Sequence, residues 1–147
     1  MKNKLLLLFA LLAAFSALAA CSQAPGATPV SGSDRDAVLA YAEPKTDNVL
    51  AGFNAGDYAA YSRDFDATMR NALPESSFIQ TRQLVTGKIG KYVSRKVDRV
   101  DRIGEYMAVV YSAAFEQEEG VTVRVVFAAG GDHSISGLFF TSPKLRQ

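Results

Sequence analysis

Apolar residues in the first part of the domain recur every three or four positions, the spacing of helices with one buried face. This pattern runs from Asp34 to about Leu84, with Ser33 or Asp34 as the predicted N-cap. Pro44 is expected to interrupt the first helix, because proline fits the first turn of a helix but not its interior. Pro74 is expected to begin the last helix. The predicted inward side chains of that helix are Phe78, Ile79 and Leu84 or Val85.

Residues 53–69, FNAGDYAAYSRDFDATM, carry three aspartates among aromatic residues. Gly56 is expected to end one helix, because glycine readily adopts a positive φ. Asp57 is expected to cap the next helix and Asp66 a third, because a carboxylate accepts the free backbone N–H groups at a helix start. Asp64 lies next to Phe65 and need not share its inward face. Structural roles therefore explain the acids better than a catalytic carboxylate pair does.

From Lys91 onward the pattern changes to the two-residue alternation of strands. The alternation predicts strands at 91–103, 106–115, 121–127 and 135–140, with turns at 117–120 and 130–132. Helices followed by consecutive short strands predict an α+β fold, in which N-terminal helices pack on a curved antiparallel sheet of about four strands.

The chain resembles a known family through three motifs: FNAGDY at 53–58, GKY at 90–92 and ISGL at 135–138. They resemble a small bacterial and archaeal domain of unknown function, placed in the nuclear-transport-factor-2-like superfamily. The resemblance covers roughly residues 36–143 and implies a cone-shaped α+β fold. It supplies no active site, because the superfamily includes isomerases and dehydratases as well as binding domains without chemistry.

The N-terminus carries the pattern of an export signal. Lys2 and Lys4 precede a charge-free apolar run, which is shorter than the roughly 20 residues a membrane-spanning helix needs. The sequence LAAC at 18–21 resembles the lipobox of bacterial lipoproteins, in which the peptide before the cysteine is removed and the thiol is lipidated. An ordinary secretory signal is the alternative. A lone free thiol is unusual in an exported protein, so lipidation of Cys21 is the prediction.

These features predict three segments: a signal peptide at 1–20, a lipidated cysteine with a flexible tether at 21–33, and one domain at 34–147. The tether is small, polar and rich in Pro and Gly. Without the signal peptide the charges nearly balance, which gives no basis for nucleic-acid binding. The predicted location is outside the cytoplasm, on the cell membrane or the outer membrane.

Aromatic side chains at helical spacing are the candidate pocket lining. The same stripe could instead form the core, and the sequence leaves both alternatives open. The candidates are Phe53, Tyr58, Tyr61, Phe65, Met69 and Phe139.

No reactive constellation stands out elsewhere. His133, the only histidine, lies in a predicted turn and is expected to be solvated. The mixed charges of 91–103 predict a solvated strand face. No catalytic residue, metal site or cofactor is predicted.

The predicted function is a membrane-anchored lipoprotein that binds a small apolar ligand or an envelope protein. A small cofactor-free enzyme is the alternative, with Asp64 or Asp66 acting beside Tyr61. A homodimer formed through the open sheet is a third alternative.

Overall fold

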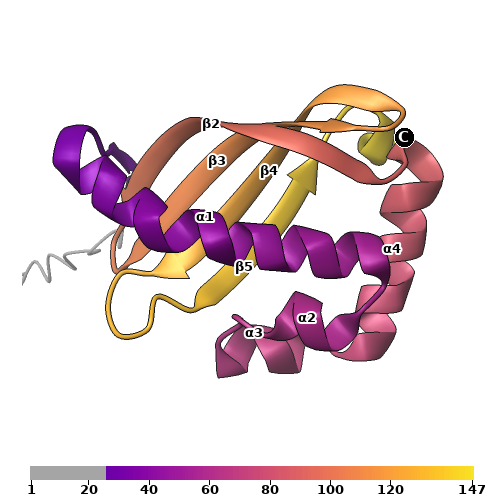
Figure 1. The fold of residues 1–147 in the computed structure, drawn as a ribbon, viewed down its shortest axis with the longest axis horizontal. Helices are drawn as coiled ribbons and strands as arrows, with labels where there is room; N and C mark the ends of the chain where they lie inside the picture. The colour runs from indigo at the N-terminus through magenta and orange to yellow at the C-terminus, as the bar shows by residue number, and fades with distance from the viewer. Residues whose placement is uncertain (1–25) are drawn as a thin grey trace, which may run out of the picture.

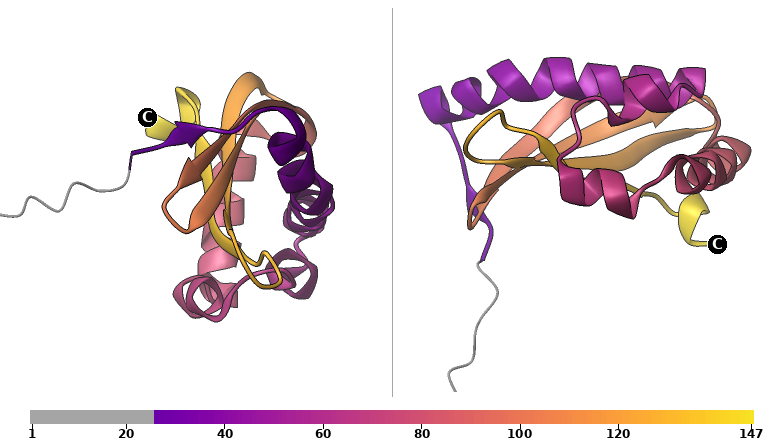
Figure 2. Two further views of the ribbon diagram at one scale, coloured as in Figure 1. Left: turned by 90° about the vertical axis from the view of Figure 1, so that its left-hand side faces the viewer. Right: turned by 90° about the horizontal axis from the view of Figure 1, so that it is seen from below.

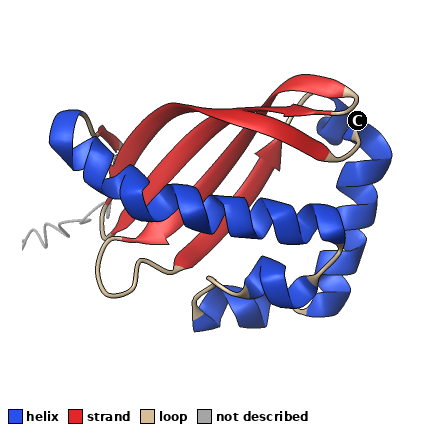
Figure 3. Ribbon diagram, in the orientation of Figure 1, coloured by secondary structure: helices blue, strands red, loops and turns tan. Residues whose placement is uncertain are grey.

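The computed structural model describes residues 26–147, so Cys21 and the predicted signal peptide lie outside the described part. Four helices lie between the first strand and the other four strands of the sheet (Figures 1 and 3). The helices are α1 Gly32–Ala55, α2 Tyr58–Ser62, α3 Ala67–Ala72 and α4 Glu75–Ile89. The strands are β1 Thr28–Pro29, β2 Tyr92–Ile103, β3 Tyr106–Phe115, β4 Glu118–Ala128 and β5 Ile135–Thr141, followed by the short 3-10 helix η1 Lys144–Arg146. This arrangement confirms the α+β prediction.

The sheet is antiparallel throughout and its strands lie in sequence order, β1-β2-β3-β4-β5. It has five strands rather than the four predicted. The additional strand, β1, comes from the segment predicted to be a tether, where Thr28 pairs with Arg102 and Pro29 with Asp101. The backbone N–H of Val30 extends this pairing by donating to the carbonyl of Val100 (2.8 Å). Two residues are too few to show an alternating pattern in the sequence.

Helix α1 lies along one face of the sheet, and the core fills the space between them (Figures 1 and 2). Buried side chains of β4 alternate with more exposed ones, as expected for a strand with one face covered, whereas β3 is buried at every position from Met107 to Tyr111. The largest fully buried side chains are Tyr111, Phe53, Phe127, Leu50, Ile89 and Ile135.

The predicted interruption at Pro44 is wrong, because α1 continues through it without ending. Pro44 and Ala40 are both exposed, so the Ala40 carbonyl that loses its helical partner faces water. The buried stripe continues across the proline, from Ala42 to Thr46 and Val49. Packing of this stripe on the sheet outweighs the local cost of proline. The helix also begins earlier than predicted, with Ser31 as its N-cap.

Helix α4 begins after Pro74 as predicted, and of its predicted inward residues only Ile79 is wrong, since Val85 is the buried one of the alternatives Leu84 and Val85. Phe78 and Val85 are buried, whereas Ile79 and Leu84 are 47% and 53% exposed. The helix stands at one end of the sheet, across the C-terminal end of α1, and only one narrow side of it meets the core (Figure 1). The sequence predicts a wider apolar face than this helix can bury in its position, so residues at the margin of that face stay exposed.

The expectation of a solvated charged face on β2 is wrong for Arg95, whose side chain is only 7% exposed. Its guanidinium donates to Glu43 (3.1 Å) and Asp47 (2.5 Å) of α1 and to the hydroxyl of Tyr92 (3.2 Å). It also lies 5.0 Å from the ring centre of Tyr111. Burial by itself would lower the pKa of Arg95, but these hydrogen bonds and the charge of Glu43 raise it overall. Arg95 thus joins α1 to β2 as a permanent cation.

Within residues 26–147, no helix is both long enough and apolar enough to cross a membrane.

Candidate functional site

The FNAGDY motif has structural roles at almost every position. Phe53 is fully buried, Gly56 ends α1 with a φ of 74°, and the Asp57 carboxylate accepts the N–H of Ala60 (3.0 Å), which confirms its role as a cap. The Asn54 amide group pairs with the backbone at the start of β2, donating to the carbonyl of Tyr92 (2.7 Å) and accepting its N–H (3.0 Å). The motif joins the helical half of the chain to the sheet.

Replacing Asn54 by aspartate is expected to lower the free energy of unfolding by about 1–2 kcal/mol, because the new side chain keeps the acceptor but loses the donor. The Tyr92 carbonyl then faces a carboxylate. Urea unfolding of Asn54→Asp beside the wild type measures the change. Asn71→Asp, at an exposed position of α3, is the matched control. Equal losses in the two variants would contradict the role of Asn54.

The aromatic stripe fills the interior. Phe53, Tyr61 and Phe65 are at most 4% exposed, and Tyr61 contacts both other rings, with ring centres 6.0 and 5.0 Å apart. The half-buried Tyr58 donates its hydroxyl to the carbonyl of Leu73 (2.9 Å). The structure places these four residues in the packing around α2, outside the lining of the apolar pocket beside α3. Met69 and Phe139 do lie on the wall of that pocket.

The two acidic residues that follow α2, Asp64 and Asp66, are hydrogen-bonded to groups other than Tyr61. Asp66 caps α3 by accepting the N–H of Met69 (2.7 Å), as predicted. Asp64 accepts from the Asn48 amide (3.0 Å) and lies 3.8 Å from Arg63. In the described part of the chain, neither carboxylate is hydrogen-bonded to Tyr61.

His133 is not solvated as predicted. Its ring stacks on that of Tyr41, with centres 3.9 Å apart and planes 8° from parallel, and its Nδ1 lies 3.1 Å from the Ala128 carbonyl. The backbone of His133 has a positive φ of 52°. This contact joins the β4–β5 turn to α1, which sequence alone could not show because the two residues are distant in the chain.

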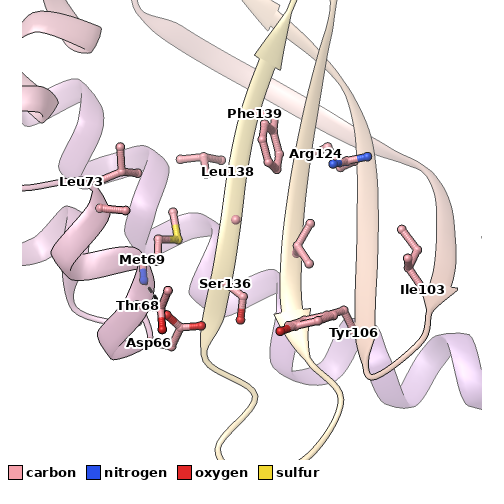
Figure 4. A pocket seen from close by; sticks show the side chains of 13 residues that line it. Asp66, Thr68, Met69, Leu73, Ile103, Tyr106, Arg124, Ser136, Leu138 and Phe139 are labelled. Carbon is pink, nitrogen blue, oxygen red and sulfur yellow. Dashed lines mark hydrogen bonds between the residues drawn. The ribbon is translucent and has the colours of Figure 1, made fainter. Parts of the chain in front are cut away.

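An apolar pocket lies at the edge of the sheet, beside β5 (Figure 4). Its floor is the face of β3–β5 that carries Tyr106, Arg124 and Phe139, opposite the inward side chains that contact α1. Its other wall is α3. The volume is about 560 Å³, within the roughly 300–1,000 Å³ of ligand pockets.

Backbone hydrogen bonds hold α3 beside this strand. Ile135 donates its N–H to the carbonyl of Asp64 (2.7 Å), and its own carbonyl accepts the N–H of Asp66 (2.9 Å). The linker between α2 and α3 thus adds a parallel bridge, Phe65 to Ile135, to the outer edge of β5. This bridge positions Met69 and Leu73 opposite Leu138 and Phe139 across the pocket.

The pocket walls are mainly apolar, with a few polar groups. Met69, Leu73, Val126, Leu138 and Phe139 supply apolar surface. Phe139 and Tyr106 are 49% and 46% exposed, so large rings face solvent here.

The polar groups of the pocket come from separate elements. Arg124 places its guanidinium 4.6 Å from the ring centre of Phe139. The Ser136 Oγ is buried and has no hydrogen-bond partner among the described residues. Such a group costs about 1–3 kcal/mol of stability. Sequence analysis missed Arg124, Ser136 and Tyr106 as lining residues, because outward positions of a strand look like ordinary solvated ones until a helix is placed beside them.

Residues 26–147 contain no cluster of three or more histidine, cysteine or acidic side chains that could hold a metal ion.

Fold and pocket together define a small α+β domain with a ligand-sized recess at its sheet edge. The chain belongs to the family described as protein of unknown function, DUF3887, whose model matches residues 46–138. The match runs from the middle of α1 into β5 and includes Arg124 and Ser136, and it ends one residue before Phe139. Neither a curated protein nor a solved structure matches the chain.

Proposed function

We propose that this protein is an exported lipoprotein, anchored through Cys21, whose domain binds a small apolar ligand in the pocket between α3 and β5. We also propose that its fold is a nuclear-transport-factor-2-like cone. Helices that precede the sheet, with the long α1 lying along one face, support that relation.

The pocket carries the binding proposal. Apolar side chains from α3, β4 and β5 converge on one recess of ligand size, and its large rings remain exposed in the free protein. Covering this surface with an apolar ligand contributes about 25 cal/mol per Å² of apolar area removed from water. The candidate acids, in contrast, already have hydrogen-bond partners: Asp66 caps α3, and Asp64 accepts from Asn48. The geometry therefore supports binding over acid–base catalysis.

Native mass spectrometry of protein purified from its own cells tests ligand binding. The wild type is expected to carry a co-purifying small molecule. Ala72→Phe is expected to lose it, because the new ring enters the pocket from α3 without replacing a core residue. Ala51→Phe, at an exposed position of α1, is the control that keeps the ligand. An unliganded wild type, or a ligand that survives in Ala72→Phe, would exclude this pocket as the binding site.

Cys21→Ser is expected to move the protein from the membrane fraction to the soluble fraction. The prediction follows because acyl chains on the cysteine contribute about 0.8 kcal/mol per buried methylene to anchoring. Fractionation followed by immunoblotting measures the distribution, and Ser22→Ala is the matched control that leaves Cys21 intact. Membrane retention of Cys21→Ser would overturn the anchoring proposal and leave the pocket proposal unaffected.

A further inference from the structure

We propose that the pocket beside β5 takes a single-chain amphiphile with an anionic group that pairs with Arg124 and a neutral hydroxyl that meets Ser136. This inference rests on the proposed function, since it names the ligand class of the same pocket. It is carried by three observations on residues 26–147: a cation without an ionic partner among them, a buried hydroxyl without a hydrogen bond to any of them, and an apolar surface between the two groups.

Arg124 has the setting of an anion receptor. Among residues 26–147, no carboxylate lies within 4.0 Å of its guanidinium, whereas Arg35 and Arg63 each have one and Arg95 and Arg99 each have two. Arg70, Arg82, Arg102 and Arg146 likewise have none there, so Arg124 is distinguished by its position in the wall of this pocket. The ring of Phe139 supports the guanidinium from one side at 4.6 Å. The planar guanidinium can donate two parallel hydrogen bonds to a carboxylate or a phosphate. The arginine is thus held at the rim of an apolar recess with its donors available.

Ser136 supplies the second polar contact. Its Oγ lies in the pocket wall, is buried, and has no hydrogen-bond partner in the described part of the chain. Buried polar groups are nearly always paired in proteins, and an unpaired one calls for an explanation such as a missing ligand. A ligand hydroxyl can both donate to this oxygen and accept from it.

The distance between the two contacts defines the length of the ligand. Arg124 pairs with Phe139 across the β4–β5 ladder, and Ser136 lies three positions before Phe139 on β5. At roughly 3.3 Å per residue, the Cα atoms of Ser136 and Phe139 lie about 10 Å apart along β5, and this separation sets the approximate span of the ligand. Gly137 allows the Phe139 ring to lie against the strand between the two contacts, because a Cβ there would lie 2.9 Å from the Phe139 ring and 3.4 Å from Val126.

The charged side chains of the pocket define the orientation of the ligand. Asp66 lies at the Ser136 end, and Arg124 lies toward the other (Figure 4). A negative charge beside Ser136 disfavours an anion there and favours a neutral hydroxyl, whereas an anion beside Arg124 gains a partner. The ligand therefore has its anionic group at Arg124 and its hydroxyl at Ser136.

Calorimetric titration of the full-length chain, carrying Cys21→Ser so that no detergent is needed, tests this inference. The probes are decan-1-ol, decanoate and 10-hydroxydecanoate, which differ only in their ends. We expect decanoate to bind at least about tenfold more tightly than decan-1-ol, and 10-hydroxydecanoate several-fold more tightly again. Arg124→Gln should abolish the preference for decanoate over decan-1-ol. Lys96→Gln removes an exposed charge from β2, outside the pocket, and should leave all three affinities unchanged.

Ser136→Ala separates a binding role from a structural one. It should make 10-hydroxydecanoate bind no more tightly than decanoate, while leaving the urea midpoint of the free protein unchanged or raised. A lower midpoint would show that the hydroxyl is used in folding, and this would overturn its assignment to the ligand. Equal binding of decan-1-ol and decanoate would overturn the anionic group but keep the proposed apolar pocket. Failure of all three probes, together with an unliganded native protein, would overturn the proposed function itself.

Discussion

Replacing Gly52 by alanine is expected to lower the free energy of unfolding by about 3 kcal/mol, because α1 and α2 meet at this glycine without space for a side chain. A Cβ on Gly52 would lie 2.4 Å from the backbone nitrogen of Tyr61 and 2.9 Å from the carbonyl carbon of Ala60. These are backbone atoms, so no change of rotamer can relieve the overlap. The short helix α2 must move, and Tyr61 then loses its packing against Phe53 and Phe78.

Urea unfolding followed by circular dichroism measures this loss. Gly87→Ala is a matched control, because Gly87 also lies within a helix but has no atom within 4 Å of its Cβ position. Alanine there is expected to raise the free energy of unfolding by about 0.5–1 kcal/mol through helix propensity. If Gly52→Ala unfolded at the wild-type urea concentration, the close approach of α1 and α2 would be refuted.

Raising the pH from 8 to 12 is expected to lower the free energy of unfolding by about 2 kcal/mol through Tyr61. Burial, and then the neighbouring Tyr58, raise the pKa of Tyr61 from 10.0 to about 12. The folded state therefore holds this proton more tightly than the unfolded state does. The stabilisation is complete below pH 10 and is lost as the pH rises from 10 to 12, at about 1.4 kcal/mol for each unit of pKa difference.

Tyr111 adds to this loss in the same direction. Its pKa is raised chiefly by burial, with the hydrogen bond to Glu43 contributing and that of Thr46 acting against it. Its hydroxyl donates to Glu43 (2.7 Å) beneath α1, so ionisation would place two negative groups in contact. The loss of stability at alkaline pH therefore has two sources, Tyr61 beside α2 and Tyr111 beneath α1.

Urea midpoints measured between pH 8 and pH 12 test the alkaline loss. Tyr61→Phe removes one titrating group and should flatten the profile between pH 10 and 12, whatever its effect at pH 8. Tyr106→Phe, at an exposed position, should leave the slope as in the wild type. A Tyr61→Phe profile as steep as that of the wild type would show that Tyr61 ionises as freely in the folded state as in the unfolded one.

Local features of the fold could be predicted because they depend on neighbours in the sequence. Gly56, Asp57 and Asp66 act as predicted, since a helix end or cap involves backbone groups only a few residues away. Strands β3 and β5 lie within one residue of their predicted ends, because β-branched and aromatic residues bounded by turns mark them locally.

The errors share a different origin. Pro44 stays within a helix because the sheet holds the residues on both sides of it, and Arg95 is buried because α1 covers it. Strand β1 forms because β2 offers it an edge. Each of these outcomes depends on a partner more than 40 residues away, so no local pattern could reveal it.

The features of the candidate site also separate into those that depend on the local sequence and those that depend on tertiary contacts. The sequence by itself determined which residues are apolar, the approximate positions of α2–α4 and β2–β5, and hence that Met69 and Phe139 could face a pocket. Only the tertiary structure decided that the aromatic stripe fills the core and that the recess forms on the other face of the sheet, beside Arg124 and Ser136. The physical reason is that a core needs only enough apolar surface to bury, whereas a pocket needs two walls, and the bridge from Phe65 to Ile135 brings α3 to β5.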